Sequence, residues 1–417
     1  MVKKGYKQTE IGVIPEDWES TCFGENVKIY RGGSPRPIQD YITDSPYGIN
    51  WIKIGDVGEN DKYISSTQEK IIPEGVSKSR EVHVGDFILS NSMSFGRPYI
   101  LNIHGCIHDG WLTIQEYKNT FYTEYLYYLL SSDLVYQQYI SMAAGSSVKN
   151  LNKNKVSALT VAYPTFPEQE RIAEALSDVD SLIISLKKLV EKKKAIKQGT
   201  MQELLTGKKR LPGFTGEWET INLSKKSKIK ARIGWQGLTT SEYLDSGFAY
   251  LVTGTDFVNG KIDWNGCHYV TKARFEQDKN IQIQNDDILI TKDGSLGKTA
   301  LVKGLDKPAT LNSGVFVIRP LQESYDSTFA YYVLSSFVFK DFLDHLSAGS
   351  TIIHLYQKDI SKFEFAVPVD INEQTAIASI LSDMDSEIET LEEKLEKTRQ
   401  VKQGMMQELL MGRIRLV

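Results

Sequence analysis

An internal repeat is the feature of this sequence that most constrains its fold. Residues 167–211 read PEQERIAEALSDVDSLIISLKKLVEKKKAIKQGTMQELLTGKKRL and return at 372–416 as NEQTAIASILSDMDSEIETLEEKLEKTRQVKQGMMQELLMGRIRL, with no gap. The offset is constant, since 373 − 168 and 416 − 211 both equal 205, so Glu168 matches Glu373 and Leu211 matches Leu416. A match of this length does not arise by chance. The sequence therefore predicts an internally duplicated protein.

Each copy of the repeat has the apolar spacing of a coiled-coil helix. Apolar residues alternate four-residue and three-residue steps, at Ile172, Leu176, Val179, Ile183, Leu186 and Val190 in the first copy and at Ile377, Leu381, Met384, Ile388, Leu391 and Leu395 in the second. Neither copy contains a proline or a glycine between the start of its seam and Gly199 or Gly404. Each copy can therefore form one helix of about 37 residues, roughly 55 Å long.

The charges beside the two seams favour pairing of the helices with each other. Lysines flank the first seam where glutamates flank the second: Lys187, Lys188, Lys192, Lys193, Lys194 and Lys197 against Glu387, Glu389, Glu392, Glu393 and Glu396. Opposite charges beside an apolar seam favour this intrachain pair over self-pairing. The alternative is two separate amphipathic helices, each covering a globular core.

The segments before the helices are more divergent copies that keep a common order of short motifs. Asp86-Phe-Ile-Leu is echoed by Asp287-Ile-Leu-Ile, Phe95-Gly-Arg97 by Leu296-Gly-Lys298, and Ala144-Gly-Ser-Ser147 by Ala348-Gly-Ser-Thr351. We therefore expect globular domains at 1–166 and 212–371 and long helices at 167–211 and 372–417. Short β-type runs (52–54, 87–89, 288–290 and 315–318) and helical stretches at 122–139 and 328–346 indicate an α+β fold.

Composition excludes several classes of protein. A formal charge of −4 and a pI near 6.0 give no overall basic surface, so any DNA binding needs local patches or partners. The N-terminus has no apolar signal core, and we expect a cytoplasmic protein. Three cysteines without a CxxC pair predict reduced thiols, with no disulfide framework and no structural zinc.

Two short patterns suggest chemistry without meeting its requirements. Gly294-Ser-Leu-Gly-Lys-Thr299 is similar to a phosphate loop, but position 292, where that loop needs glycine, is lysine. His104, Cys106 and His108 alternate on one side of a possible strand, yet no fourth metal ligand is evident, and a buried cysteine with hydrogen-bonded histidines is commoner. There is also no methyltransferase motif, so we expect neither a catalytic centre nor a metal in this chain.

Four motifs, taken with the duplication, carry a family resemblance that spans essentially the whole chain. They are Ile11-Gly-Val-Ile-Pro-Glu-Asp-Trp18, Trp51-Ile-Lys-Ile-Gly-Asp56, Pro167-Glu-Gln169 and Lys197-Gln-Gly-Thr-Met-Gln-Glu-Leu-Leu205. The sequence resembles the specificity (S) subunits of type I restriction-modification systems. The resemblance implies two target-recognition domains that each read half of a bipartite double-stranded DNA site.

The resemblance also implies how the helices and the partners are arranged. The helices would pair antiparallel with pseudo-two-fold symmetry and act as a spacer, with readers about 34–36 Å apart on one face of a duplex. Two methyltransferase (M) subunits would dock on the chain, and restriction (R) subunits would join for cleavage. S-adenosylmethionine, ATP and magnesium are then expected on those partners and not on this chain.

DNA-reading candidates follow from this interpretation, because forked or hydroxyl-bearing side chains read base edges. In the first domain they are Arg31, Ser34, Arg36, Asn91, Ser92, Arg97, Ser146, Ser147, Lys149 and Asn150. In the second they are Arg232, Gln236, Lys292, Ser295, Lys298, Ser350, Thr351 and His354. Each of these residues could instead be a solvated loop charge or a turn former.

The nearly identical helix ends predict two copies of one partner. The candidate docking residues are Gln198, Gln202, Glu203, Leu204 and Leu205 with Gln403, Gln407, Glu408, Leu409 and Leu410. Rival interpretations are an interaction scaffold that binds protein or sugar, a self-sufficient nuclease, and a specificity subunit of a related system outside type I.

Overall fold

The chain forms two compact units, each with part of both long helices. The computed structural model describes residues 3–58, 61–91, 95–143, 150–234, 237–346 and 354–416. Unit 1 comprises Met1–Lys187 with Glu393–Val417, and unit 2 comprises Lys188–Glu392. This division cuts both long helices, whereas the sequence suggested one segment for each helix. The globular part of each unit is called its head below.

Unit 1 combines fourteen described strands with three short helices and the start of α4 (Phe166–Leu204). The strands are β1 (Tyr6–Thr9), β2 (Gly12–Pro15), β3 (Glu19–Cys22), β4 (Lys28–Arg31), β5 (Ile42–Thr43), β6 (Ile49–Ile52), β7 (Tyr63–Ile64), β8 (Glu69–Ile71), β9 (Arg80–Val82), β10 (Phe87–Ser90), β11 (Pro98–Leu101), β12 (Gly105–Ile107), β13 (Trp111–Gln115) and β14 (Thr160–Tyr163). The short helices are α1 (Thr123–Leu130), α2 (Asp133–Ala143) and α3 (Lys153–Ser157).

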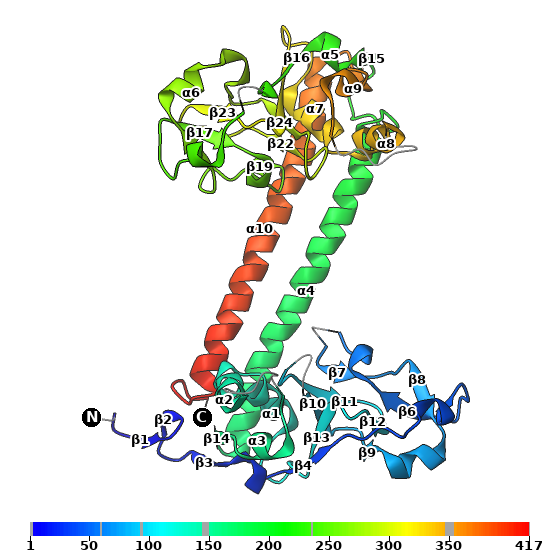
Figure 1. The fold of residues 1–417 in the computed structure, drawn as a ribbon, viewed down its shortest axis with the longest axis vertical. Coiled ribbons are helices and arrows are strands. Elements are labelled where there is room, and N and C mark those ends of the chain that lie inside the picture. The colour runs from blue at the N-terminus through cyan, green and yellow to red at the C-terminus, as the bar shows by residue number, and fades with distance from the viewer. Residues whose placement is uncertain are drawn as a thin grey trace. The chain divides into compact units, whose positions relative to one another are not determined.

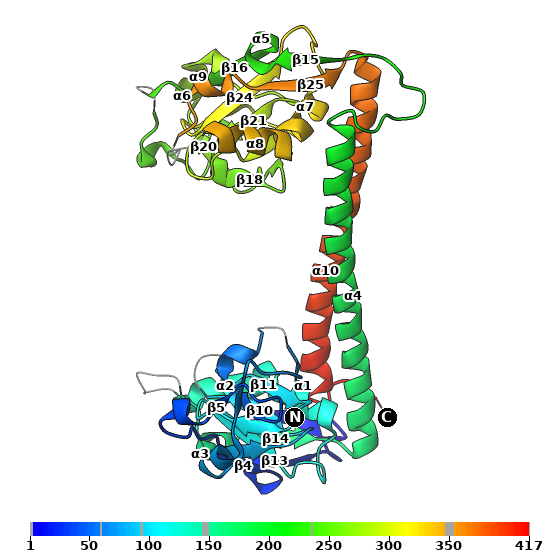
Figure 2. The same ribbon diagram turned by 90° about the vertical axis from the view of Figure 1, so that its right-hand side faces the viewer.

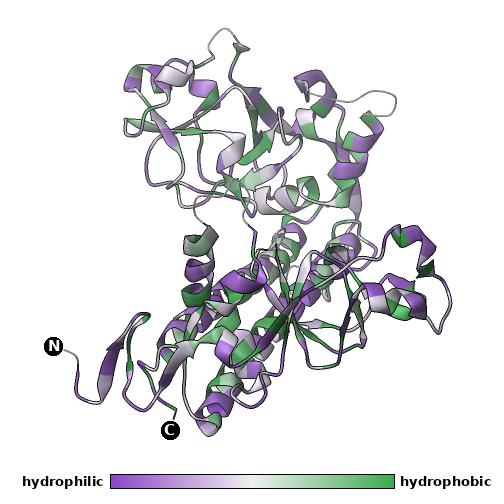
Figure 3. Cartoon of the chain, turned by 60° about the horizontal axis from the view of Figure 1, so that its bottom comes forward, coloured by the Kyte–Doolittle hydropathy of each residue, from purple (hydrophilic) through white to green (hydrophobic). Residues whose placement is uncertain are grey.

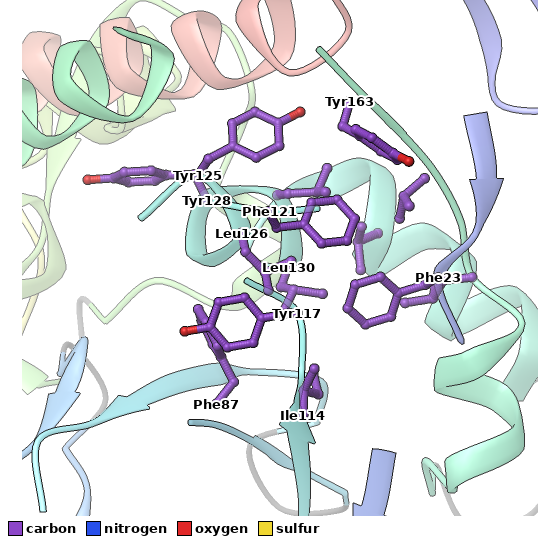
Figure 4. Close-up of a cluster of buried hydrophobic side chains, with 14 of the residues drawn as sticks. Phe23, Phe87, Ile114, Tyr117, Phe121, Tyr125, Leu126, Tyr128, Leu130 and Tyr163 are labelled. Atoms are coloured by element: carbon purple, nitrogen blue, oxygen red, sulfur yellow. The ribbon is translucent and has the colours of Figure 1, made fainter. Parts of the chain in front are cut away.

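Two five-stranded sheets build the head of unit 1. Their strand orders are β4-β13-β10-β11-β7 and β5-β8-β6-β12-β9. Strands β10 to β13 are almost wholly buried, so they read as apolar runs without alternation. The main core lies between the first sheet and α1, where Phe87 and Ile114 from the sheet lie below Phe121 and Leu126 (Figure 4).

Unit 2 repeats this plan with fewer strands. Its elements are β15 (Trp218–Asn222), α5 (Leu223–Lys226), β16 (Ser227–Ala231), β17 (Ala249–Val252), β18 (Phe257–Val258), β19 (Lys261–Ile262), β20 (His268–Val270), α6 (Lys272–Glu276), β21 (Ile288–Thr291), β22 (Thr299–Leu301), β23 (Ala309–Leu311), β24 (Val315–Pro320), α7 (Ser327–Leu334), α8 (Phe337–Leu346), α9 (Gln357–Ile360), β25 (Glu364–Pro368) and α10 (Ile371–Leu409). The sheet β16-β24-β21-β22 corresponds to β4-β13-β10-β11 of unit 1, and the sheet β20-β17-β23 corresponds to β8-β6-β12.

The strand registers show that the two heads are duplicates. Ile29 of β4 pairs with Ile114 of β13, and Ile229 of β16 pairs with Ile318 of β24. Each second sheet also contains one parallel pair, β6 with β12 in unit 1 and β17 with β23 in unit 2. The predicted α+β fold with two homologous domains is therefore confirmed.

The two helical stretches expected before the long helices are each broken in the middle. Instead of one helix at 122–139 there are α1 and α2, and instead of one at 328–346 there are α7 and α8. The Ser132 hydroxyl donates to the Leu129 carbonyl (2.7 Å), and Ser336 donates to Val333 in the same way (2.7 Å). A serine that caps both helix ends competes with the helical ladder, which explains the break.

The long helices α4 and α10 have 39 residues each and run antiparallel within each unit. In unit 2, Lys193 pairs with Glu387 (2.6 Å) and, further along α4, Arg210 pairs with the earlier Glu373 (2.6 Å). The seam residues predicted from the heptads are buried or half-buried, and Figures 1 and 2 show the two helices side by side. The predicted coiled coil is confirmed.

The predicted charge pairing is also present, because Lys194 binds Glu392 at 2.6 Å in addition to the Lys193–Glu387 pair. Hydrophobic and hydrophilic residues are interspersed over the helices and strands of the chain, as elements with one buried and one exposed face require (Figure 3). Across the described ranges, every helix is too short or too polar to cross a membrane.

Candidate nucleic-acid interface

One loop junction in each unit holds candidate DNA-reading residues on a backbone frame. In unit 1 the junction follows β10, where the Asn91 amide donates to the Gly110 carbonyl (3.1 Å). The Asn91 carbonyl accepts from Leu151 (2.9 Å), which ties the segment that begins at Asn150 to the end of the strand. Asn91 is thereby fixed at its backbone on both sides.

The matching junction in unit 2 uses the same hydrogen bonds with a different side chain. The Lys292 amide donates to Gly314 (2.9 Å), and the Lys292 carbonyl accepts from Leu355 (2.9 Å). Asparagine and lysine thus stand at equivalent places. A fixed backbone that carries a variable polar side chain is what a module for reading different base edges requires.

The Gly turns that follow these junctions need glycine at one position. Gly96 and Gly297 have φ of +77° and +76°, and each amide donates back to the end of the preceding strand, Ser90 (3.0 Å) and Thr291 (2.9 Å). The motifs Phe95-Gly-Arg97 and Leu296-Gly-Lys298 are therefore equivalent turns in the two units. The Lys298 amide also donates within its turn, to Thr291 Oγ1 at 2.9 Å, so this amide is not free to bind a phosphate as the amides of a phosphate loop are.

Four of the candidates in unit 1 converge on one residue that the sequence did not single out, Asp109: two contact its carboxylate and two its backbone carbonyl. Ser34 Oγ donates to Asp109 Oδ1 (3.0 Å), Arg36 lies 3.9 Å from Oδ2, and both Arg31 Nε (3.4 Å) and Asn91 Nδ2 (3.1 Å) donate to the Asp109 carbonyl. Arg36 keeps 84% of its side chain exposed, so it remains available to a ligand. Asp109 thus contacts the two arginines through different groups, Arg31 through its backbone carbonyl and Arg36 through its carboxylate.

The other candidates in unit 1 are more loosely held. Arg97 is half-buried with its guanidinium 5.8 Å from the Tyr99 ring centre, and Asn150 is exposed. Ser92, Ser146, Ser147 and Lys149 lie outside the described residues. Nothing in the sequence marked Asp109, because a single aspartate before a strand is usually a turn former.

Arg232 in unit 2 differs from its expected role as an exposed reader. It is 1% exposed, and its guanidinium donates to the Leu311 carbonyl (2.8 Å) and to Thr310 Oγ1 (3.2 Å). Burial, with Arg274 nearby, lowers the pKa of Arg232 from its ordinary value. Gly32 occupies the equivalent position in unit 1, because it is the first residue after β4 as Arg232 is the first residue after β16. We therefore assign Arg232 a structural role in this conformation.

The remaining candidates in unit 2 surround its Gly turn. Lys298 and Ser295 are exposed, and half-buried Lys292 has its ammonium 5.5 Å from the centre of the Phe316 ring. His354 forms an ion pair with Asp293, its partner in an isolated β-bridge. Gln236, Ser350 and Thr351 lie outside the described residues.

The candidate docking residues at the helix ends separate into a buried and an exposed set. Leu204, Leu205, Leu409 and Leu410 are 2–4% exposed, and each pair belongs to the core of the head in its own unit. The polar members Gln198, Gln202, Glu203, Gln403 and Gln407 are exposed, and Glu408 is half-buried. Similar heads receive both leucine pairs, so the identity of the helix ends has an intramolecular cause besides any shared partner.

Two polar clusters are duplicated between the units, and the first joins the segment that follows one long helix to the start of the other. Arg415 forms a bidentate pair with the buried carboxylate of Glu168 (2.6 and 2.8 Å), and Arg210 binds Glu373 in the same way (2.6 and 2.7 Å). Arg415 also binds Asp17 and holds the pKa of that carboxyl below its ordinary value. Sequence reasoning missed these clamps because their partners are about 165 or 245 residues apart.

The second cluster joins a tyrosine of the head to an aspartate of the coiled coil. The Tyr128 hydroxyl donates to Asp180 (2.8 Å), which also binds Lys402 (2.7 Å). Tyr332 donates to Asp385 (2.8 Å), which binds Lys197. The same three residue types at the same places show that the duplication extends to the contacts between head and helices.

Beside the helix end in unit 1 lies a groove of about 610 Å³. It is lined on one side by Asp133 at the break between α1 and α2, and on the other by Gln403, Met406 and Gln407 of α10. Exposed glutamines beside a thioether suit a protein partner better than a small charged ligand.

The alternating His104, Cys106 and His108 do not form one site. Cys106 is fully buried, and this burial raises the pKa of its thiol to about 11. His108 Nδ1 accepts from the Gly110 amide (3.0 Å). The commoner interpretation of these two residues, a buried cysteine and a hydrogen-bonded histidine, is confirmed.

Comparison with known proteins agrees with this architecture. The family model for the type I restriction modification DNA specificity domain matches twice, at residues 15–198 and 217–399. A type I restriction enzyme specificity subunit, MjaVIII, of Methanocaldococcus jannaschii is 24% identical, over 97% of this chain and 94% of that protein. Similar folds occur in the S subunit from M. genitalium (TM-score 0.57, 16% identity, 94% and 96% of the two chains) and in the HsdS subunit from Thermoanaerobacter tengcongensis (TM-score 0.51, 18% identity, 99% and 100%). The chain therefore belongs to the family of type I restriction-modification DNA specificity subunits.

Proposed function

We propose that each unit reads one half of a bipartite DNA sequence. The observation that carries the proposal is the duplicated loop junction, in which Asn91 and Lys292 share one hydrogen-bonded frame. Gly110 and Gly314 are equivalent, because each accepts a hydrogen bond from the amide of Asn91 or Lys292. The two residues before them therefore also match: His108 and Asp109 in unit 1, and Asn312 and Ser313 in unit 2. Two copies of one frame with different donors and acceptors suit two different half-sites.

Exchange of a head tests this proposal directly. Replacing residues 1–166 with those of a relative of different specificity is expected to change one half-site and leave the other unchanged, as mapped from methylated adenines. The reciprocal exchange of 212–371 is the matched control and should change the other half-site. A change in both half-sites after either exchange would contradict modular reading.

Single side chains in unit 2 separate base reading from phosphate binding. Lys298→Ala is expected to weaken binding to all sequences and to reduce the slope of log K against log salt by about one, because one phosphate contact is lost. Lys292→Asn should instead alter preference within the second half-site. The same substitutions would leave DNA binding unchanged if the chain were a protein-binding or sugar-binding scaffold.

We further propose that the chain is non-catalytic and positions two M subunits, with R subunits joining for cleavage. Apolar residues stay exposed on the helices of both units, which supports a partner there: Leu182, Ile184 and Val401 in unit 1, and Leu189 and Ile196 in unit 2. The exposed glutamines of the two helix ends are duplicated as well. Native mass spectrometry of the assembled methyltransferase should give two M subunits per chain; one copy would overturn this stoichiometry.

The cofactors of the reaction follow from this division of labour. We propose that S-adenosylmethionine, ATP and magnesium act on the partner subunits. The purified chain alone is expected to show neither methyl transfer nor magnesium-dependent cutting of DNA; cutting by the chain alone would favour a self-sufficient nuclease.

A further inference from the structure

A cluster of two imidazoles and one carboxylate lies on the surface of unit 1, away from the loop junction. Its members are Glu81 and His83 on or beside β9 and His104 beside β12, and their ligand-type atoms all lie within 4.8 Å of one another. His104 Nε2 is 2.8 Å from Glu81 Oε1, and the two histidine rings have centres 5.2 Å apart.

The strand register explains why these side chains meet. β9 and β12 are antiparallel, with Val82 opposite Gly105 and Glu81 opposite Cys106. One step further along the ladder, His83 comes opposite His104, and alternation places Glu81 on the same face as His83. The backbone ladder therefore brings the three side chains together before any ion binds.

We propose that Glu81, His83 and His104 form a binding site for one divalent transition-metal ion of the zinc type. Imidazole and carboxylate are the ligands that Zn²⁺ takes in proteins, at about 2.0–2.2 Å from each atom. Two such atoms on a shared ion are at most about 4.2 Å apart. The three side chains are exposed, so small rotations close the remaining gap. Three protein ligands leave a coordination position open to water or to a partner group.

An outer-shell carboxylate supports the assignment. Asp86 Oδ2 lies 3.9 Å from His83 Nδ1, and Asp86 is fixed because it accepts from the His83 amide (2.9 Å) and from Gln115 (2.6 Å). A carboxylate near the second nitrogen of a ligating histidine orients its ring. The metal would clip β9, an edge strand of its sheet, to β12.

Unit 2 supplies an internal comparison. The β9–β12 pairing is reduced there to one isolated bridge between Gln282 and Thr310, which matches the Glu81–Cys106 pair. The same register replaces His83 with Gln284 and His104 with Pro308. The backbone pairing is thus duplicated in unit 2 but the metal-ligand residues are not, so we expect one zinc site per chain. Zinc binding here would revise the sequence-based expectation of a chain without metal.

Titration calorimetry of the full-length, untagged protein with ZnCl₂ tests the proposal. We expect one saturable site per chain, no binding of Mg²⁺, and a higher melting temperature with zinc, because imidazole ligands favour borderline over hard ions. His83→Gln and His104→Gln should each weaken zinc binding by at least about tenfold. His345→Gln, which removes an exposed histidine of α8, is the matched control and should bind as the unaltered protein does.

Circular dichroism in EDTA should give the same spectrum for all variants, which separates loss of ligands from loss of fold. The tetrahedral absorption bands of Co²⁺, present in the unaltered protein and absent from His104→Gln, provide an independent readout. The proposal is overturned if no saturable zinc binding occurs, or if both histidine variants bind zinc as the His345→Gln control does.

Discussion

The two units share their contacts between head and helix but differ in the side chains around the loop junction. The Arg415–Glu168 clamp of unit 1 returns as Arg210–Glu373 in unit 2, with the same bidentate geometry. By contrast, Asn91 of unit 1 is replaced by Lys292 in the equivalent frame. The comparison teaches that the duplicated halves keep their scaffold contacts and change the polar side chains at the loop junction.

The largest expected effect tests whether the two clamps are equivalent. Arg415→Ala should destabilise unit 1 by about 3 kcal/mol, because it leaves the Glu168 carboxylate buried (4% exposed) without its partner. Arg210→Ala should destabilise unit 2 in the same way. Urea unfolding followed by circular dichroism measures both; the Arg→Lys variants, which keep the charge but not the fork, should lose less.

The two clamps are not equivalent if Arg210→Ala has the same free energy of unfolding as the unaltered protein.

The extra Asp17 contact of Arg415 makes the stability of unit 1 depend on pH. Since the folded-state pKa of Asp17 is lowered, its contribution is present above the unfolded pKa and is lost as the pH falls through the folded value.

The glycine turns are expected to differ in tolerance. A Cβ at Gly96 would lie 2.7 Å from the rigid ring of buried Tyr139, whereas one at Gly297 would meet the flexible end of Leu343 at 2.4 Å. Gly96→Ala should therefore cost about 2 kcal/mol and Gly297→Ala about 1 kcal/mol, mostly from the left-handed backbone. Thermal melts of both variants decide this. Equal losses would mean that the backbone strain alone sets the cost.

Removal of one hydroxyl from each tyrosine cluster is expected to have matched, smaller effects. Tyr128→Phe and Tyr332→Phe each lose a hydrogen bond to an aspartate of the coiled coil. Each should cost about 1 kcal/mol in urea unfolding. Tyr63→Phe, whose exposed hydroxyl binds Glu124, serves as a control for a surface hydrogen bond and should cost less. A clear inequality between Tyr128→Phe and Tyr332→Phe would show that the clusters have diverged in strength.

The smallest expected effect concerns the charges beside the seam. Lys194→Ala removes an ion pair whose lysine side chain is 56% exposed, so the loss should be below about 0.5 kcal/mol and should shrink further at high salt. Val190→Ala, which truncates a buried seam residue of α4, is the contrasting control and should cost more. A larger loss for Lys194→Ala than for Val190→Ala would show that charge outweighs apolar packing in the pairing.

The parts of the fold that follow local periodicity were predictable from the sequence. The heptad seam from Ile172 to Val190 predicted α4 because one apolar residue every three or four positions needs only local information. The break at Ser132 was not predicted, because a serine within an apolar stretch is also compatible with a continuous helix.

The candidate site was only partly predictable, because exposure depends on tertiary contacts. Arg36 is exposed as a reader requires, whereas Arg232 is buried under β23, and both have similar sequence surroundings of glycine and small residues. Asp109, which gathers the polar groups of unit 1, lies about 75 residues from Ser34 and Arg36. No local pattern contains such long-range proximity.

The reciprocal clamps have a consequence for how such genes can recombine. Arg415 is encoded in the second half of the gene and binds Glu168 at the start of α4, whereas Arg210 is encoded in the first half and binds Glu373 at the start of α10. A crossover that joins halves of two different genes within the long helices must therefore bring a Glu168-type carboxylate together with an arginine at position 415. We therefore expect hybrids between such genes to tolerate exchange of the heads more readily than loss of either arginine or either carboxylate.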